Sequence, residues 1–348
     1  MRTYLLPEEG AFYKANLHCH STVSDGDLSP EEIKRQYMEE GYSIVAYTDH
    51  DIMIPHHELT DENFLAMEAY EMEINDRYDV PFKHVKTCHL CFVALRENVK
   101  QICYHRTKFM PKCSQPSQHL AKFDESLPDF ERVYTPECIN EIIRRGVEGG
   151  FFVTYNHPTW SEESYEDYMA YEGMHAMEIV NYSSQSIGYD EYNPRVFDDM
   201  LRGGKAVLCS ACDDNHNHDK RGTLRYDSFG GFNMIKAKSL TLPDVGDALL
   251  QGHFYASEAP LIHELYIEDG AVHITCSPAR EIALITKTRH NQTAYRTTDA
   301  EGNRIPVTEA VFTVAPDDGY FRLTVTDEDG RHATTQAYDA ETYKLANR

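Results

Sequence analysis

Residues 16–26 (NLHCHSTVSDG) and residues 46–51 (AYTDHD) decide which fold we predict for this chain of 348 residues. His18 and His20 are one residue apart on the first predicted strand, and residues i and i+2 of a strand point to the same side. Both imidazoles can therefore bind one ion, and neutral imidazole is the commonest side-chain metal ligand at neutral pH. His50 closes the next apolar run. Ligand-type residues thus end the first two strands, where α/β folds place their chemistry.

Short apolar runs alternate with helical stretches from residue 16 to about residue 255. The runs predicted as strands are 15–18, 43–47, 89–95, 151–155, 176–180 and 206–211. Three helices are predicted from a proline in the first turn and a glycine at the end, namely 30–40, 136–146 and 243–252. Alternation of this kind predicts a parallel sheet or barrel.

Two segments depart from this alternation. Residues ~97–133 have little periodicity and read as an insertion over one end of the barrel. The insertion is either a lid that turns basic residues toward an anion or a solvated loop. From residue 258 to residue 348, short alternating strands separated by turn signals predict a small all-β sandwich. We expect a structural or oligomerisation module there, with carbohydrate binding as the alternative, and its strand edges permit homo-oligomers.

The composition limits the partners and the location of the protein. The formal net charge of −24 argues against bulk nucleic acid and anionic membranes as partners, and leaves only short oligonucleotides open. A small anionic substrate remains compatible, because bound divalent cations reverse the local field. The N-terminus lacks a signal-peptide pattern, no apolar run is long enough to span a bilayer, and we expect a cytoplasmic protein.

The chain has nine cysteines, and two pairs have CxxC spacing, Cys88/Cys91 and Cys209/Cys212. A four-thiolate zinc site is one interpretation of these pairs. We favour buried, inert thiols in a reducing compartment, because each pair lies in or beside an apolar run rather than in a glycine-rich knuckle.

Potential metal ligands recur at the predicted strand ends and in the adjoining turns. They are His18, His20, Asp25, His50, Glu73, His89, His157, Asp214 and His216. A single histidine at a strand end is usually structural or exposed, but the order and spacing of this set make chance assembly improbable. We therefore predict a metal site.

The motifs resemble the PHP (polymerase and histidinol phosphatase) superfamily of metal-dependent phosphoesterases over roughly residues 11–257. The resemblance rests on NLHCHSTVSDGDLSPEEI, AYTDHD, NHP and CDDNH. It implies a distorted (β/α)7 TIM-like barrel, residues 1–257, with two or three metal ions at the C-terminal ends of the strands. The stretch GHFYASEAP at 252–260, before a small β domain, resembles a subgroup that includes carbamate-ester hydrolases.

The resemblance also implies three sets of ligands. They are His18, His20, Glu73 and Asp214 for the first metal, Glu73, His89 and His157 for the second, and Asp25, His50 and His216 for the third, with Glu73 bridging the first two. Two positions have alternatives, because Asp213 precedes Asp214 and His84 precedes His89. Mixed imidazole and carboxylate ligands suit Zn, Mn or Fe.

We expect a metal-bridging hydroxide to attack the phosphorus of a small phosphorylated metabolite or nucleotide, with no separate nucleophile. The expected orienting carboxylates are Asp49, Asp51 and Asp213. The candidate contacts to the substrate are Arg106, Lys108, His218 and Arg221. Two alternatives remain, namely hydrolysis of a carbamate, ester or amide at the same site, and a non-catalytic sensor or interaction protein. A phosphomonoester needs converging cations that a neutral ester does not.

Overall fold

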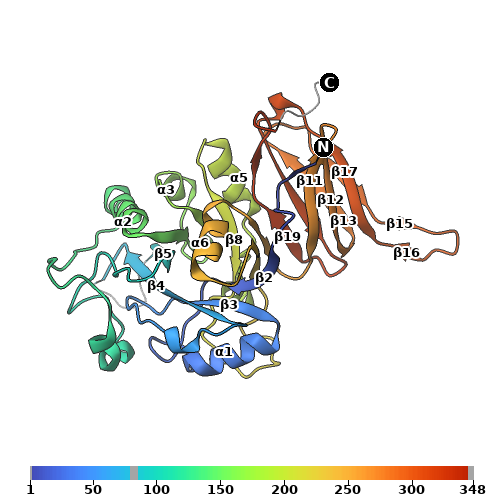
Figure 1. The fold of residues 1–348 in the computed structure, drawn as a ribbon. Coiled ribbons are helices and arrows are strands. Elements are labelled where there is room, and N and C mark those ends of the chain that lie inside the picture. Colours follow the sequence, from blue (N-terminus) through green and yellow to red (C-terminus); the bar gives the residue numbers. More distant parts are fainter. Residues whose placement is uncertain (1, 79–84, 344–348) are drawn as a thin grey trace.

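The computed structural model describes residues 2–78 and 85–343 and combines a mixed α/β part with an all-β part (Figure 1). The α/β part contains a run of seven neighbouring strands in chain order: β2 (Ala11–Asn16), β3 (Tyr42–Tyr47), β4 (Leu65–Asn75), β5 (Thr87–Ala94), β6 (Phe151–Tyr155), β7 (Ala176–Asn181) and β8 (Leu208–Cys212). The first predicted strand is displaced, because β2 ends at Asn16. His18 and His20 therefore lie in the segment that directly follows it.

The sheet is mixed rather than wholly parallel. Four pairs are parallel, β2–β3, β3–β4, β6–β7 and β7–β8, whereas β5 is antiparallel to both of its neighbours. The connection from residue 76 to residue 86 is too short for the crossover that a parallel β4–β5 pair would need. The sequence did not predict β4, because the acids Glu68, Glu71 and Glu73 interrupt its apolar pattern.

The predicted helices are present with one displaced end. Ser29 accepts a hydrogen bond from the backbone N–H of Glu32 and caps α1 (Pro30–Glu39), and Thr135 caps α2 (Pro136–Gly149) in the same way. α2 passes through Gly146, where a Cβ atom would lie 2.5 Å from the Phe92 ring, and stops at Gly150 with φ 92°. Gly146 therefore allows close packing on β5 instead of ending the helix. The other helices are α3 (Tyr165–Tyr168), α4 (Tyr182–Ser186), α5 (Pro194–Arg202) and α6 (Leu242–Leu250), with 3-10 turns at His57–Leu59, Lys112–Leu120 and Pro316–Asp318.

Among the described residues, no strand pairs with the outer edge of β8, and two side chains bind some of its backbone N–H and carbonyl groups instead. Beyond β2 the sheet continues through β9 (Phe232–Ala237) and β10 (Phe254–Ser257), both with antiparallel partners. Asn233 of β9 accepts from the N–H of Ala211 and donates to its carbonyl oxygen, at 3.1 and 2.9 Å. Gln336 does the same for Cys209, at 2.8 and 3.0 Å, and also donates to the carbonyl of Phe254. The carboxamides of Asn233 and Gln336 thus pair the backbone groups of Ala211 and Cys209 along this edge, which we call the β8 seam.

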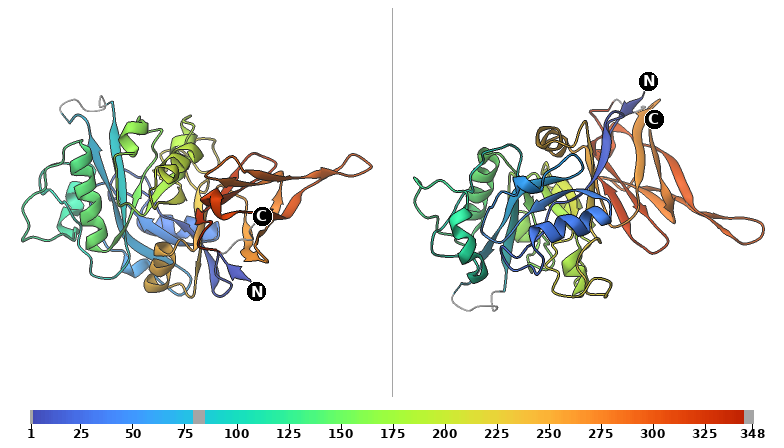
Figure 2. Two further views of the ribbon diagram at one scale, coloured as in Figure 1. Left: turned by 90° about the horizontal axis from the view of Figure 1, so that it is seen from above. Right: turned by 60° about the horizontal axis from the view of Figure 1, so that its bottom comes forward.

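The all-β part has two facing sheets and shares one of them with the α/β part (Figure 1). Its strands are β1 (Thr3–Tyr4), β11 (Ile262–Glu268), β12 (Ala271–Ala279), β13 (Glu281–Thr286), β14 (Gln292–Tyr295), β15 (Thr297–Thr298), β16 (Arg304–Ile305), β17 (Val307–Thr313), β18 (Tyr320–Thr326), β19 (His332–Thr335) and β20 (Tyr338–Asp339). β19 pairs with β10, which joins the parts, and β1 pairs with β11, so N-terminal residues complete the β part. The β15–β16 hairpin projects away from the body in both views of Figure 2.

The sequence left two further questions, namely whether the cysteines form a zinc site and whether any helix could span a membrane. All nine cysteines are free and most of them are buried. Within the described ranges, no cysteine belongs to a group of three or more potential metal ligands, so the structure does not assemble a four-thiolate site. None of the helices in these ranges is both long and apolar enough to cross a membrane.

Candidate metal centre

Histidine and carboxylate side chains converge where β2, β3 and β8 end and beside β4. The Nε2 atoms of His18 and His20 lie 3.2 Å apart, and Oδ1 of Asp214 lies 3.1 Å from the first and 3.0 Å from the second. Both imidazoles are fully buried, and Asp214 is nearly so. Asp214 has φ 54°, a left-handed backbone conformation that turns the chain directly after β8. These three residues form one potential ligand group.

Glu71 of β4 lies at the centre of the imidazoles. Its carboxylate oxygens lie 3.0 to 3.4 Å from ring nitrogens of five histidines, His18, His20, His50, His89 and His157. Its side chain is 1% exposed. His18, Glu71 and His157 form a second potential ligand group, and the shared His18 joins it to the first. Glu71 is therefore placed to bridge two ions.

This geometry corrects the expectation that Glu73 is the bridging ligand. Glu73 lies opposite His89 in the β4–β5 ladder, and its carboxylate accepts a hydrogen bond from Asn75. Among the residues that the structure describes, it belongs to none of the potential ligand groups. Glu71 and Glu73 point to the same side of the strand, since they are two residues apart. The alternation of side chains cannot distinguish them. The depth of each residue along β4, which only the packed sheet fixes, places Glu71 at the imidazoles.

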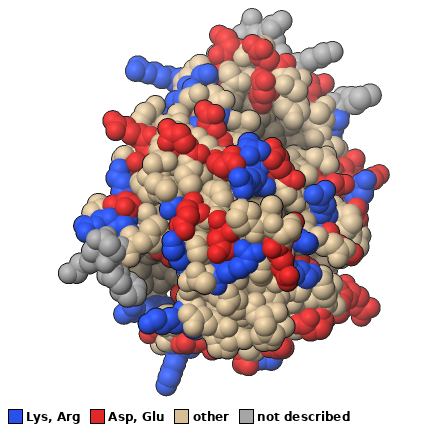
Figure 3. All heavy atoms as spheres, turned by 90° about the vertical axis from the view of Figure 1, so that its left-hand side faces the viewer, with Lys and Arg blue, Asp and Glu red and all other residues tan. Residues whose placement is uncertain are grey.

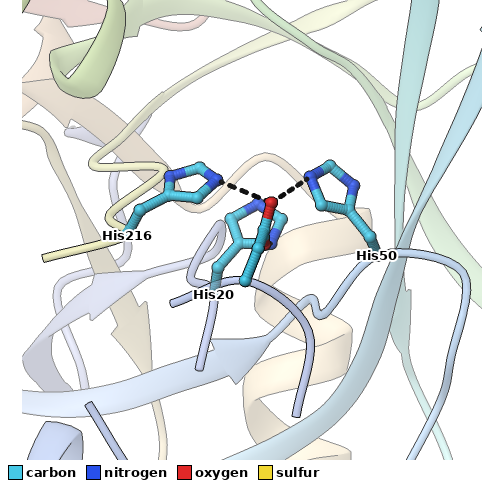
Figure 4. Close-up of side chains that lie close together, drawn as sticks. His20, His50 and His216 are labelled. Atoms are coloured by element: carbon cyan, nitrogen blue, oxygen red, sulfur yellow. Dashed lines mark ion pairs between the residues drawn. The ribbon is translucent and has the colours of Figure 1, made fainter. Parts of the chain in front are cut away.

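A third potential ligand group lies at the mouth of the cluster. His20, His50 and His216 approach the carboxylate of Asp25 from separate segments (Figure 4). Oδ2 of Asp25 is 3.6 Å from Nε2 of His50 and 3.8 Å from Nε2 of His216. The rings of His20 and His216 stack at 4.3 Å. The side chain of Asp25 is 40% exposed, so this end of the cluster opens to solvent.

His89 and His157 line the opposite wall and adjoin Trp160. The ring of Trp160 is 5.3 Å from that of His89 and 4.9 Å from that of His157. His89 lies in β5, which begins two residues earlier than predicted, at Thr87, and the alternative His84 lies outside the described residues. His157 follows β6 with φ 24°, which aims its ring back at Glu71.

The backbone and side chains around the cluster fix its ligands. Glu178 of β7, which the sequence did not single out, accepts from Nδ1 of His18 at 2.7 Å and from the backbone N–H of His157. A glutamate within the apolar run of a buried strand was the available signal, because such residues are buried only when they have partners. Asp49 accepts hydrogen bonds from Ser21 and Ser24 and so holds the loop that carries Asp25.

Asp213 acts beside Asp214 rather than in its place. It is buried and accepts from three consecutive backbone N–H groups, Phe229 to Gly231, and from the hydroxyl of Tyr37. Of the two alternatives for this motif, Asp214 therefore faces the imidazoles. Asp213 ties the end of β8 to the loop before β9.

The imidazoles and carboxylates of the cluster shift one another's pKa values. Burial disfavours a charged imidazole, yet Asp214 and Glu71 raise the pKa of His20 to about 10. The same two carboxylates raise the pKa of His157 to about 9 against its burial. Burial likewise opposes the ionised form of Glu71, but the imidazoles hold its pKa well below the usual range. The metal-free protein thus holds protons among these groups, and a cation binding there must release them.

The donor set fits divalent cations. Among the described residues, Nε2 of His89 is buried and has no hydrogen-bond partner, while the buried Oδ1 of Asp214 and Nδ1 of His50 have polar neighbours within the cluster, at 3.0 to 3.1 Å. Buried polar atoms are normally satisfied, so each such atom requires an explanation. Here the unpaired nitrogen belongs to His89, whose other ring nitrogen lies 3.0 Å from Glu71 in the cluster. Lone pairs on imidazole and carboxylate are the ligands that zinc, manganese and iron take in proteins.

The four basic residues expected at the substrate all form ion pairs with acidic side chains. Arg106 pairs with Asp129 and Lys108 with Glu131, all within residues 97–133. His218 pairs with Asp27, and Arg221 pairs with Glu39 and Glu40 at the end of α1. Basic and acidic side chains alternate over the face shown in Figure 3, the side of α2 and the insertion. The ring of His218 lies 5.7 Å from that of His216, beside the third ligand group, whereas the printed ion pairs of Arg106, Lys108 and Arg221 are to acidic side chains outside the ligand groups.

Comparisons with known proteins give distant likenesses. No family model matches this chain. A 5'-3' exoribonuclease from Haemophilus influenzae is 50% identical over 38 residues, which are 11% of this chain and 14% of that protein. The chain thus spans a small part of that relative's length.

Three solved structures resemble larger parts of the chain. A two-domain protein from Bacteroides vulgatus, with a predicted PHP-like metal-dependent phosphoesterase, covers 97% of this chain and 99% of its own at 15% identity and a TM-score of 0.43. A protein from Bifidobacterium adolescentis, assigned as a metal-dependent phosphoesterase, covers 62% and 91% at 15% identity and 0.40. An amidohydrolase from Chromobacterium violaceum with bound sulfate and no metal covers 58% and 87% at 14% identity and 0.39.

Proposed function

We propose that this protein is a metal-dependent hydrolase that cleaves a phosphoester of a small metabolite or nucleotide. The observation that carries the proposal is the position of Glu71, within 3.4 Å of five imidazoles in a buried cluster that Asp214 and Asp25 complete. A carboxylate shared among so many imidazoles is typical of a site for two or more cations.

The residues that would hold the ions are those of the three ligand groups, with Glu71 in the place expected of Glu73. When bound, zinc, manganese or iron ions would supply an activated water and polarise the scissile group. Glu178 fixes the tautomer and orientation of His18 by accepting from Nδ1, which leaves Nε2 to face the cluster. Asp49 and Asp213 hold the loops of Asp25 and Asp214 and so keep the carboxylates in place.

The remaining parts of the proposal concern the architecture and the setting. We take β2 to β8 as a distorted seven-stranded (β/α) barrel over residues 1–257, with the β sandwich of residues 258–348 as its accessory part. We also propose that the protein is cytoplasmic, acts on a small molecule and has no membrane partner. Strand edges of the sandwich would join copies of the chain into homo-oligomers.

One observation favours a second function, hydrolysis of a carbamate, ester or amide by the same cluster. The basic residues expected to clamp a phosphate, Arg106, Lys108 and Arg221, are in ion pairs with acidic side chains away from the imidazoles. A neutral ester or carbamate does not need such a clamp, and the cations alone can polarise its carbonyl group.

The test combines metal analysis with a substrate panel. The purified protein is stripped of metal, reloaded with Mn²⁺ or Zn²⁺, and assayed with phosphomonoesters, phosphodiesters, carboxylesters and carbamates. The proposal expects metal-dependent turnover of at least one phosphoester. Turnover of carboxylesters or carbamates alone would favour the second function. No turnover in any class, with metal bound, would refute hydrolysis by this site and favour a sensor.

A pair of variants tests the site itself. His18→Ala with His20→Ala should lower bound metal and abolish turnover while the protein stays folded, because both rings are buried ligands of one group. The matched control is His57→Ala with His119→Ala, which removes two exposed imidazoles that belong to none of the three ligand groups. Wild-type turnover by the first variant would show that the site is assigned to the wrong residues.

A further inference from the structure

The insertion of residues 97–133 is bonded at both ends to the segment that follows His50. Near its start, the side chain of Gln101 accepts from the backbone N–H of Met53 at 3.0 Å and donates to the carbonyl of Asp51 at 2.9 Å. The backbone N–H of Lys122 donates to the carbonyl of Met53. These contacts place the insertion beside the metal centre as a support for one of its loops.

Arg132, at the end of the insertion, makes the charged contact to this loop. Its side chain is 1% exposed, and Nη2 lies 2.5 Å from Oδ1 of Asp51. Nη1 donates to the carbonyl of Glu73 at 2.9 Å, and the guanidinium lies 4.4 Å from the centre of the Phe109 ring. One cation therefore joins the loop after β3 to the end of β4, the strand that carries Glu71.

The backbone of Asp51 is in the left-handed region, with φ 58°. Few residues with a side chain adopt this region, although Asp does so more often than most. The backbone N–H of Asp51 donates to the carbonyl of Glu71 at 2.8 Å. His50 and Glu71 form an isolated parallel β-bridge. The position of the His50 ring thus depends on how Asp51 is held.

We propose that Arg132 is a positioning residue that sets the affinity of the cation group formed by His20, Asp25, His50 and His216. It acts through its ion pair with Asp51 and its hydrogen bond to the Glu73 carbonyl, so the insertion completes the metal centre rather than closing over it. The inference rests on the proposed metal-dependent function. We expect this group to be affected most, because His50 belongs to it and not to the other two groups, His18–His20–Asp214 and His18–Glu71–His157.

The experiment compares two substitutions with a matched control. Arg132→Met removes the charge and the donors but keeps much of the apolar stem, whereas Arg132→Lys keeps the charge with a single ammonium group. Arg322→Met is the control, since Arg322 is also buried, pairs with Asp198 through Nε and Nη2 at 2.8 and 2.9 Å, and adjoins Phe197. It lies in β18, in the sandwich, so it controls for the general cost of unpairing a buried aspartate.

Two readouts are used, and neither is turnover. Hydrogen exchange of residues 48–53 in the metal-free protein reports the loop, and titration with Mn²⁺ alone reports the number and affinity of bound ions. We expect Arg132→Met to speed exchange in this loop and to weaken one class of ion by roughly tenfold to a hundredfold, as loss of a supporting partner usually does. Arg132→Lys should restore part of that affinity, and Arg322→Met should change neither readout.

The outcomes separate this inference from the proposed function. If Arg132→Met leaves both loop exchange and Mn²⁺ affinity at wild-type values, the positioning role is refuted. An equal loss in Arg132→Met and Arg322→Met would also refute it, because the effect would be general destabilisation. If the wild-type protein binds no Mn²⁺ or Zn²⁺ at all, the proposed function fails, while the loop exchange still tests the contact between Arg132 and Asp51.

Discussion

The substitution that tests the centre most sharply is Glu71→Gln, with Glu73→Gln as its control on the same face of β4. Glutamine keeps the size of glutamate and removes one unit of negative charge. Glu71 lies within 3.4 Å of five ring nitrogens, so its carboxylate would be a direct ligand of an ion bound by those rings. Glu73 is directed to Asn75 instead.

The expected magnitude follows from the charge that is removed. Two unit charges ~4 Å apart interact by roughly 4 kcal/mol at an effective dielectric constant of ~20. A loss of that size corresponds to roughly a thousandfold in affinity, and a divalent ion would not lose less. Glu71→Gln should therefore abolish tight binding of at least one ion, whereas Glu73→Gln should change affinity by no more than a few fold.

Equilibrium competition with a chromophoric chelator, using Mn²⁺ and Zn²⁺ separately, measures both affinities on folded protein. Circular dichroism of each variant confirms that the sheet is retained. The reasoning would be refuted by the reverse result, in which Glu73→Gln loses the ion and Glu71→Gln keeps it. That outcome would restore Glu73 as the bridging ligand.

Two further predictions concern stability. Burial among Tyr134, Tyr155 and Tyr171 raises the pKa of Glu163 from 4.5 to about 7, so the folded protein favours the protonated side chain. The free energy of unfolding should therefore fall as the pH rises from ~4.5 to ~7, by up to roughly 3 kcal/mol. Glu163→Gln should therefore gain stability relative to wild type between pH 5 and pH 8 in thermal melts, and an unchanged difference would contradict this. Gln336→Ala leaves the N–H and carbonyl of Cys209 unpaired and should cost roughly 2–4 kcal/mol in urea unfolding, whereas the exposed control Gln251→Ala should cost little. Equal midpoints for these two variants would show that the seam does not need this carboxamide.

Much of the local structure follows from short-range sequence signals. The pairing of Ser29 with Pro30 and of Thr135 with Pro136 places the starts of α1 and α2, because a capping side chain and a fixed φ act within one turn. The series of short strands that the sequence predicts after residue 258 is present as β11 to β20 for the same reason, since each turn signal lies next to the strands it joins. The sequence does not predict β4, because its acidic residues interrupt the apolar pattern of the strand.

The sequence by itself determined that His18, His20, His50, His157 and Asp214 belong together, because their order and their places after predicted strands are local properties. Only the tertiary structure decided that Glu71 and not Glu73 meets them, that Glu178 supports His18, and that Arg132 reaches Asp51 from a segment without periodicity. The physical reason is that strand alternation fixes the side to which a residue points, while the register between strands fixes its depth. That register depends on contacts between residues far apart in the chain, which no local pattern encodes.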